Sequence, residues 1–230
     1  MKIKILNTFI LFIILNFSLF AQTQKILFQG NYDYKKIHFG MALDFGAYNL
    51  YSDFNDNFFS NNNLLSVETK NDPCFGLSFL IPDLRLNNNI NYRHIITVKT
   101  IQRNIHYRFK DSQGIIQKVE SWFLESGHYI KFRGDRINNS RIYIFSGPNF
   151  AIDMASEKDV KNQNIFKLNR LNISLEIGFG YDFYFEYFKF APQIKYSYGL
   201  RNLIVNDNTI YTNLINGFYS RGFQFSITFE

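Results

Sequence analysis

Hydrophobic and polar residues alternate along much of this chain with a period of two. The clearest stretch runs from residue 171 to residue 183. One face carries Leu171, Ile173, Leu175, Ile177, Phe179, Tyr181 and Phe183, and the other carries Asn172, Ser174, Glu176, Gly178, Gly180 and Asp182. Because successive side chains of a strand point to opposite faces, this pattern predicts a β-strand with one apolar and one polar face.

Seven further segments show the same alternation, so the sequence predicts eight strands. They cover residues 37–47, 74–81, 90–107, 122–132, 141–153, 188–198 and 222–229. In the 90–107 segment the apolar residues change sides between Val98 and Ile101. This change predicts a β-bulge near Lys99–Thr100.

The links between these segments alternate in length. Long polar links are expected at 52–72, 108–118, 155–166 and 201–218, and shorter ones at 87–89, 133–140 and 184–187. This layout is typical of an eight-stranded antiparallel transmembrane β-barrel of the bacterial outer membrane, with both termini periplasmic. A soluble lipocalin-like barrel, with its apolar face inward, is the alternative. The long strands, and the glycine and serine on their polar faces, favour the membrane barrel.

An eight-stranded barrel is just wide enough for side chains to fill its lumen. The charged residues predicted to point inward are Asp44, Arg93, Glu125, Lys131, Arg141, Asp153, Arg170, Glu176, Asp182, Lys189 and Lys195. Because both signs of charge share a narrow space, we expect these residues to form ion pairs and to close the lumen. The sequence therefore predicts a filled barrel and not a channel.

The first 21 residues have the pattern of a secretory signal peptide. Lys2 and Lys4 precede an apolar stretch from Ile5 to Phe20, and Ala21 offers a cleavage site. We therefore expect residues 1–21 to be removed and residues 22–230 to form the barrel domain. An uncleaved membrane anchor is the alternative, but the apolar stretch is short for a bilayer span.

Composition agrees with a membrane barrel. Aromatic residues make up 19% of the chain although its mean hydropathy is only −0.18, and barrels use aromatic residues on the lipid-facing wall and in both girdles. The positive charges are scattered among Asp and Glu, which argues against nucleic-acid binding. The single cysteine, Cys74, excludes an intrachain disulfide and a cysteine-rich metal site.

Candidate catalytic residues are few. Ser126 and His128 lie two residues apart, on one face of the predicted strand, and a serine–histidine pair can serve acyl chemistry. No nucleophile-elbow glycine motif flanks Ser126, and the sequence has no phosphate-binding loop, HExxH motif or cysteine–histidine metal spacing. We therefore interpret His128 as a structural or interfacial residue, and we expect no enzymatic activity, no cofactor, no metal and no small-molecule substrate.

Residues 120–156 carry the most specific motif of the chain. Its members are Lys131, Phe132, Arg136, Asn138, Asn139, Arg141, Tyr143, Gly147, Asp153 and Ser156. This series resembles the PorT family, called SprT in gliding bacteria, of the type IX secretion system of Bacteroidetes. The segments 38–51 and 74–90 and the FSITFE ending also fit the family. One departure is Ser126-Gly127, where family members have a proline after the Leu-Glu pair.

The resemblance implies a non-enzymatic outer-membrane barrel, without a cofactor, that is needed for protein export and, in motile species, for gliding. The expected partners are outer-membrane lipids and other secretion-system proteins. A generic small barrel of the OmpA/OmpX type, acting in adhesion or envelope integrity, is the alternative function. A lipid-modifying barrel enzyme that uses Ser126 and His128 is the third.

The turn at 133–140 is the candidate docking site for a partner protein. Its candidate residues are Arg133, Arg136, Asn138, Asn139 and Arg141. Arginine offers a planar fork to carboxylates, and asparagine offers both donors and acceptors, so such a turn is equipped to bind a protein. The alternative is that the asparagine pair only shapes the turn, because asparagine tolerates left-handed backbone conformations.

Overall fold

Nine antiparallel strands and one short 3-10 helix make up the described part of the chain. The computed structural model describes residues 26–54, 64–110, 115–155, 167–205 and 215–230, so the expected signal peptide (1–21) lies outside the described residues. The elements are η1 (Tyr32–Tyr34), β1 (Ile37–Phe54), β2 (Leu64–Thr69), β3 (Asp72–Arg85), β4 (Ile90–Phe109), β5 (Ile115–Arg133), β6 (Ser140–Asp153), β7 (Leu171–Tyr184), β8 (Lys189–Gly199) and β9 (Ile215–Phe229). None of the helical structure in these ranges is long and apolar enough to cross a membrane.

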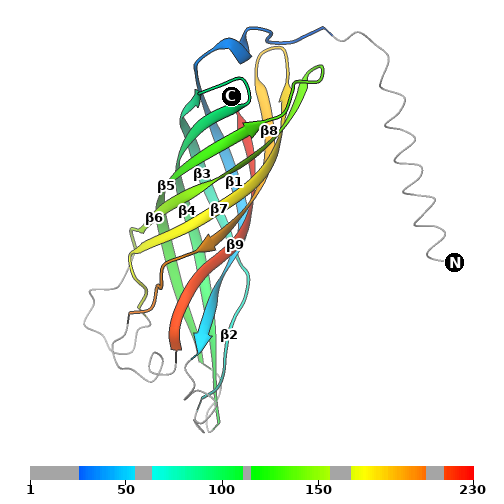
Figure 1. Cartoon of the computed structure of the whole chain (residues 1–230). Coiled ribbons are helices and arrows are strands. Elements are labelled where there is room, and N and C mark those ends of the chain that lie inside the picture. Colours follow the sequence, from blue (N-terminus) through cyan, green and yellow to red (C-terminus); the bar gives the residue numbers. More distant parts are fainter. Residues whose placement is uncertain (1–25, 55–63, 111–114, 156–166, 206–214) are drawn as a thin grey trace, which may run out of the picture.

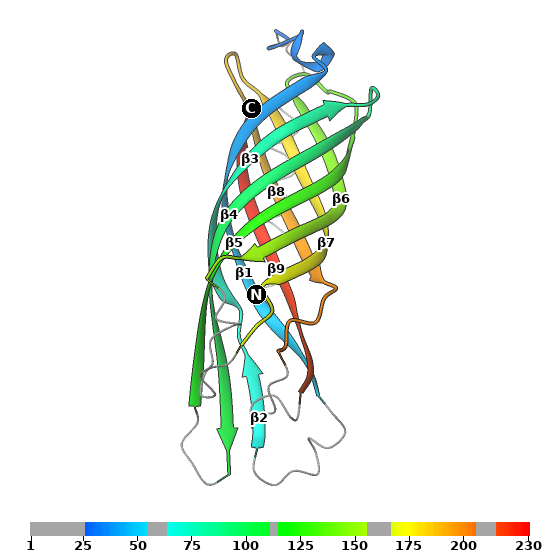
Figure 2. The same ribbon diagram turned by 90° about the vertical axis from the view of Figure 1, so that its left-hand side faces the viewer.

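Eight of the strands close a ring (Figures 1 and 2). Strand β1 pairs with β3 on one side and with β9 on the other, and the β4–β5 pairing completes the cycle. Strand β2 pairs with β4 where β3 has ended, because the Thr69–Ile105 pair of β2 follows the Cys74–Ile101 pair of β3. β2 therefore lengthens the wall, within the expected 52–72 link, and the predicted eight-stranded barrel is confirmed.

The two ends of the barrel differ. Turns at 86–89, 134–139 and 185–188 lie at one end together with η1 and the C-terminal Glu230, and we call this the turn end (Figure 1). The long links leave from the opposite end, which we call the loop end; parts of these links lie outside the described residues. The first and the last described residues of the chain therefore both lie at the turn end, as expected.

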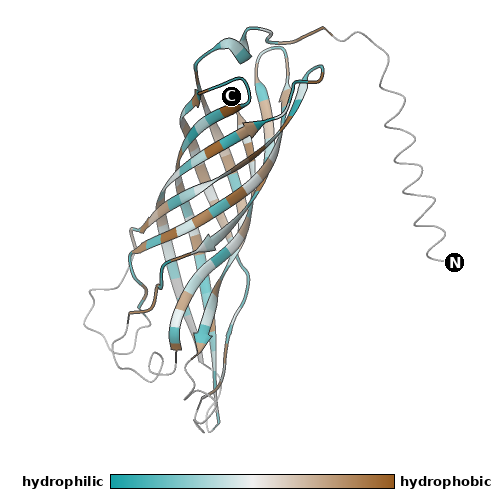
Figure 3. Cartoon of the chain, viewed as in Figure 1, coloured by the Kyte–Doolittle hydropathy of each residue, from teal (hydrophilic) through white to brown (hydrophobic). Residues whose placement is uncertain are grey.

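The outer wall is apolar and the lumen is polar. On β7, Leu175, Ile177 and Phe179 are 48%, 61% and 47% exposed, whereas Ser174 and Glu176 are buried in the lumen. Hydrophobic and hydrophilic positions alternate along the strands in Figure 3. A soluble barrel would have the apolar face inward, so this arrangement excludes the lipocalin-like alternative.

Ion pairs fill the lumen. Near the turn end, the Arg93 guanidinium lies 2.7 Å from Asp83 and 2.9 Å from Glu230, whose other carboxylate oxygen is 2.5 Å from Lys189 Nζ. The buried members of the predicted inward set are Asp44, Arg93, Glu125, Lys131, Asp153, Glu176, Asp182, Lys189 and Lys195. Seven of them form ion pairs, and Asp44 and Asp153 accept hydrogen bonds from Ser78 and from the Ala155 amide, which confirms the filled lumen. The prediction was wrong for Arg170, which is exposed in the link before β7, while Arg141 lies half-buried at the rim.

Further toward the loop end, a second group of charges is centred on Glu176. Its carboxylate accepts hydrogen bonds from Lys195 Nζ at 2.8 Å and from the Tyr129 hydroxyl at 2.6 Å. The Lys99–Glu125 pair, at 2.7 Å, lies in the same lumen. Since Glu176, Lys195, Lys99 and Glu125 are paired in this way, their opposite charges compensate one another in the barrel interior.

The predicted bulge near Lys99–Thr100 is wrong. The β4–β5 register runs without a shift from Ile90 to Tyr107, so side chains alternate strictly along β4. Ile101 and Ile105 are buried because here apolar side chains point into the lumen, on either side of the buried Arg103. The register shift of this region lies in β3, between Leu80 and Asp83, where Pro82 cannot donate to the ladder.

A small hydrophobic core closes the loop end. Its buried members are Leu50, Val67, Ile105, Tyr107, Leu168, Leu203, Ile215 and Phe218. The outward residues at the same height on β4 and β5 are mostly polar: Gln102, Arg108 and Glu120 are exposed, although Ile116 is exposed as well. Beyond the bilayer the wall contacts water, so the apolar side chains move to the inside as in a soluble protein. The change of face in the sequence therefore marks the membrane boundary.

We expect Leu175→Arg to destabilise the folded barrel by about 2–4 kcal/mol, because Leu175 lies on the apolar wall where a cation meets hydrocarbon. We call the exposed apolar part of the outer wall, to which Leu175, Ile177 and Phe179 belong, the apolar belt. Gln102→Arg, on the outward face beyond this belt, is the matched control and should leave stability unchanged. Denaturant unfolding of both variants in lipid vesicles measures the difference. Equal stabilities of the Leu175→Arg and Gln102→Arg variants would show that Leu175 does not lie in the part of the wall that contacts hydrocarbon.

We expect Ile105→Ala to cost about 2–5 kcal/mol, because it leaves a cavity in the loop-end core. His106→Ala, one position along β4 and on the outer face, should change stability by less than about 0.5 kcal/mol. The same unfolding measurement tests both. A larger loss of stability in the His106→Ala variant than in Ile105→Ala would mean that a bulge does exchange the inward and outward faces of β4.

Candidate functional site

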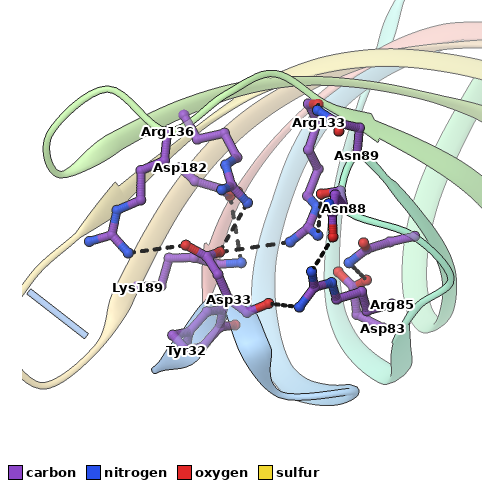
Figure 4. Close-up of polar contacts among 12 residues, drawn as sticks. Tyr32, Asp33, Asp83, Arg85, Asn88, Asn89, Arg133, Arg136, Asp182 and Lys189 are labelled. Carbon is purple, nitrogen blue, oxygen red and sulfur yellow. Dashed lines mark hydrogen bonds and ion pairs between the residues drawn. The ribbon is translucent and has the colours of Figure 1, made fainter. Parts of the chain in front are cut away.

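The N-terminal segment crosses the turn end of the barrel and brings Asp33 against the 133–140 turn (Figure 4). Residue Gln29 has a positive φ of 49°, and its carbonyl accepts the Tyr32 amide at 2.9 Å, so the chain turns into η1. This turn aims the Asp33 carboxylate at the arginines of β5, β6 and the intervening link. The Tyr32 hydroxyl donates to Glu230 at 2.6 Å and ties the segment to the lumen.

Three arginines surround the Asp33 carboxylate. Arg141 Nη1 lies 2.9 Å from Oδ1, Arg136 Nη1 lies 3.2 Å from Oδ2, and Arg133 Nη1 lies 3.8 Å from Oδ1. The Tyr184 hydroxyl donates to Oδ1 at 3.1 Å. We call these five residues the Asp33 cluster. Partial burial acts to raise the pKa of Asp33, but the arginines and the hydrogen bonds outweigh it and hold this pKa below its usual value.

Arg136 makes the most contacts in the cluster. Its guanidinium donates to the Phe28 and Gln29 carbonyls as well as to Asp33. The guanidinium carbon also lies 3.7 Å from the centre of the Tyr184 ring, in a cation–π contact. Arg136 therefore holds the N-terminal segment against the 134–139 turn and β7.

The two asparagines of the turn have different tasks. Asn139 Oδ1 accepts the Phe28 amide at 2.9 Å, and its Nδ2 donates to the Ile26 carbonyl at 2.7 Å, so it pairs with the N-terminal segment as a neighbouring strand would. Asn138 has a φ of 54° and is exposed. Its role in shaping the turn is the one expected of a residue that tolerates left-handed backbone.

A polar pocket of about 300 Å³ opens beside the cluster. Arg85, Arg133 and Arg141 line it together with Asp33 and Asp135, so positive charge is in excess. The Nε atoms of Arg133 and Arg141 are buried without a hydrogen-bond partner. A carboxylate entering this pocket would meet guanidinium groups that are already held in position.

The five predicted site residues thus lie in one place. The side chains of Arg133, Arg136, Asn139 and Arg141 come together, whereas Asn138 is exposed and takes part through its carbonyl oxygen, which accepts from Arg136 Nε. They bind this chain's own N-terminal segment, and whether the turn also binds a partner stays a prediction. Sequence reasoning missed Asp33, Tyr184 and Arg85. Asp33 precedes the first strand in a stretch without periodicity, so nothing in the pattern links it to a turn a hundred residues away.

The Ser126–His128 pair lies on the outer wall. Ser126 Oγ is 3.1 Å from His128 Nε2 and 3.0 Å from His94 Nε2, and the Tyr92 hydroxyl is 2.7 Å from His128 Nδ1. The two imidazoles stack at 4.6 Å. A nucleophile and a base are within reach of each other, but a tyrosine takes the position where an acid would orient the base. The described ranges contain no group of three or more His, Cys, Asp or Glu residues that could hold a metal.

Solved structures of two named proteins are similar to this chain. Solved structures with a similar fold include OprG of Pseudomonas aeruginosa, with 14% identity, 83% of this chain and 94% of that chain covered, and a TM-score of 0.48. Ail, the attachment invasion locus protein of Yersinia pestis, is similar in two structures with a TM-score of 0.38 each. The structure in complex with the heparin analogue sucrose octasulfate has 14% identity and covers 85% and 99% of the two chains; the other has 12% and covers 85% and 98%.

No curated relative matches the chain. The family model described as "Outer membrane protein beta-barrel domain" matches residues 20–205, which is most of the sequence. With the closed ring and the apolar outer wall, this match shows that the chain belongs to the outer membrane protein beta-barrel domain family and is a barrel of the outer membrane.

Proposed function

We propose that this barrel is a non-enzymatic component of a type IX protein secretion assembly, in which it binds a partner protein through its turn end. The observation that carries the proposal is the Asp33 cluster with its arginine-lined pocket, because the cluster includes Arg136 and Arg141 of the series that resembles the PorT family. A role in gliding belongs to the same proposal.

The filled lumen supports a function exerted through surfaces. Lys131 and Arg93 occupy the interior, and their cationic groups lie 3.8 Å and 5.5 Å from the Tyr143 ring centre. A solute would have to break this packing to pass through the barrel. An assembly component that binds other proteins needs no open pore.

The orientation of the barrel in the membrane is part of the proposal. Short turns of outer-membrane barrels face the periplasm and long loops face the exterior. The turn end and both termini would then be periplasmic, and residues 1–21 would deliver the chain as a cleaved signal peptide. A periplasmic Asp33 cluster would be accessible to periplasmic and outer-membrane proteins of a secretion machine.

The residues that resemble the PorT family have structural tasks at this end. Arg136, Asn139 and Arg141 hold the N-terminal segment, and Lys131 lies over Tyr143 in the lumen below. Gly147 is required because a Cβ there would collide with the His128 carbonyl oxygen on β5. Ser156, the last member of the series, lies outside the described residues. These contacts support the proposal that the motif resembling the PorT family serves to build the turn end, and not only the wall that any barrel needs.

Exposed groups around the cluster define the surface offered to a partner. Tyr34, which lines the pocket, is 76% exposed, and Ile26 of the N-terminal segment and Ile137 of the 134–139 turn are 78% and 71% exposed. Apolar anchors next to guanidinium groups are the composition expected of a protein–protein contact. The partner in this proposal contributes an acidic side chain or terminal carboxylate to the pocket.

A generic small barrel for adhesion or envelope integrity is the second candidate. The observation that favours it is the loop-end core, beside which β4 and β5 extend as a paired ribbon beyond the ends of β6 and β7 (Figure 2). Deletion of the gene separates the two candidates: loss of protein export supports the secretion role, and loss of adhesion alone supports the second. A lipid-modifying enzyme would lose its activity in the Ser126→Ala and His128→Ala variants.

We expect the combined Arg136→Ala, Asn138→Ala and Asn139→Ala variant to assemble as a barrel but to lose protein export. Assembly is measured by the faster migration of the unboiled protein on a denaturing gel, and export by the secreted proteome. Glu186→Ala with Tyr187→Ala, in the exposed β7–β8 turn of the same end, is the matched control and should export normally. Unchanged export in the triple variant would refute docking at this turn, and failed assembly would assign the turn to folding.

We expect Asp33→Asn to loosen the N-terminal segment. Amide hydrogen exchange of residues 26–34 should become about tenfold faster at neutral pH, since roughly 1.5 kcal/mol of charge-assisted hydrogen bonding is lost. In the wild type the folded pKa of Asp33 is lowered, so its stabilising effect is complete above the ordinary carboxyl range and is lost as the pH falls through that folded pKa. Protection should therefore persist at pH 5 and decline only in stronger acid. Equal exchange in the two proteins would show that the ion pairs do not hold the segment.

A further inference from the structure

Arg221 is a cation on the outer wall of the barrel, at the edge of the apolar belt. It lies on β9 and faces outward, opposite Asn49 of β1 and Tyr198 of β8. Phe223, the next outward residue toward the turn end, is 60% exposed and belongs to the belt. Arg221 therefore stands at the height where hydrocarbon gives way to the polar part of the leaflet at the loop end.

Two tyrosine rings hold the Arg221 side chain. Its guanidinium carbon is 3.8 Å from the centre of the Tyr51 ring and 4.7 Å from that of Tyr198. Nη2 also donates to the Tyr198 hydroxyl at 3.3 Å. Among the described residues no carboxylate pairs with this guanidinium, in contrast to Arg93 in the lumen and to the arginines of the Asp33 cluster. A cation that is held in position and has no anion beside it is suited to receive one from outside the protein.

A pocket of about 340 Å³ contains this cation. Asn49, Asn71 and Tyr51 line it together with Arg221, and Tyr196 and Phe223 form its edge toward the belt. The asparagine amides offer hydrogen-bond donors close to the guanidinium. The lining thus combines donors for an anion with an apolar side that faces the membrane.

An apolar groove of about 380 Å³ adjoins this pocket and shares Tyr196 and Phe223 with it. The two shared rings lie 4.7 Å apart. From there the groove crosses the wall over Ile194, Ile177 and Ile144 toward Phe132, near the end of β5. A polar anion site at one end and an apolar channel on the lipid side describe the shape and polarity of an acyl lipid.

We propose that Arg221 and this groove form a binding site for one phosphorylated membrane lipid, with the phosphate at Arg221 and an acyl chain along Tyr196, Ile194 and Ile177. The planar guanidinium matches two phosphate oxygens, and the tyrosines fix its orientation before the lipid arrives. A soluble anion would use only the polar pocket, whereas a lipid uses both parts. This site is independent of the Asp33 cluster, which lies at the other end of the barrel.

The test uses purified, delipidated barrel in a neutral detergent and measures lipid binding by native mass spectrometry. Phosphatidic acid is compared with diacylglycerol of the same chains, which lacks only the phosphate, and with inorganic phosphate, which lacks the chains. We expect the wild type to bind phosphatidic acid at least about tenfold more tightly than either, because a charge-assisted hydrogen bond and the groove act together.

Arg221→Gln should lower phosphatidic acid binding by about tenfold or more, the loss of one charged hydrogen-bonding group. Arg108→Gln, which removes an exposed arginine of β4 at the same end, is the matched control and should bind normally. Ile194→Trp fills the groove and should weaken binding while Arg221 is intact. Heat-dependent gel migration selects assembled protein, so that a folding defect is not counted as a binding defect.

Equal binding by Arg221→Gln and wild type would overturn the proposal, as would equal binding of phosphatidic acid and diacylglycerol. Inorganic phosphate that competes at the lipid's own concentration would identify a soluble-anion site and would also overturn it. Normal binding by Ile194→Trp would remove the groove from the site and so refute the lipid assignment.

Discussion

Closure of the sheet between β1 and β9 is the constraint on which the rest of this structure depends. In hydrocarbon every backbone amide and carbonyl must be paired within the protein, and a sheet meets this demand only when it has no free edge. The β1–β9 ladder runs from the Met41–Phe229 pair to the Phe54–Ile215 pair, along nearly the whole of both strands. Once the ring is closed with eight strands, its interior is narrow and every inward side chain must find a partner there.

The narrow lumen accounts for the unusual number of buried charges. Arg93, Lys131 and Glu176 are each almost wholly buried, which a protein tolerates only when opposite charges and hydrogen bonds surround them. Glu230 follows the last residue of β9, and its carboxylate returns into the lumen to meet Arg93 and Lys189. The end of the chain thus takes part in the same charge network that fills the barrel.

The N-terminal segment continues this network out of the barrel. Tyr32 bonds to Glu230 below it, and the neighbouring Asp33 binds the arginines of the rim. The interior charges and the surface cluster are therefore physically connected through two adjacent residues. A partner that displaced the segment from the rim would also remove the Tyr32 contact with the lumen, which gives the turn end a means of responding to binding.

The apolar belt and the loop end place their hydrophobic residues on opposite faces of the wall, because the belt contacts lipid and the loop end contacts water. Within the apolar belt the hydrophobic residues face lipid and the charges face inward. At the loop end this order is reversed, and Ile105 and Phe218 form part of an interior core. Arg221 lies on the outer wall between the apolar belt and the loop end, so its environment is neither the lumen nor open water.

The sequence alone determined the class of fold, the eight strands, the outward and inward faces of most of them, and the position of the short turns. These follow from a period of two, which is a property of each strand by itself. It also singled out Arg133, Arg136, Asn138, Asn139 and Arg141, since the 133–140 link is long and basic for a short turn. Only the tertiary structure decided what these residues bind, because Asp33 reaches them by closure of the ring and not by any local pattern. The tertiary structure likewise showed that the change of face between Val98 and Ile101 is a membrane boundary and not a bulge. A change of solvent along a strand and a slip in its register produce the same hydrophobic pattern in a sequence. Only the pairing of β4 with β5, which runs without a shift, distinguishes the two.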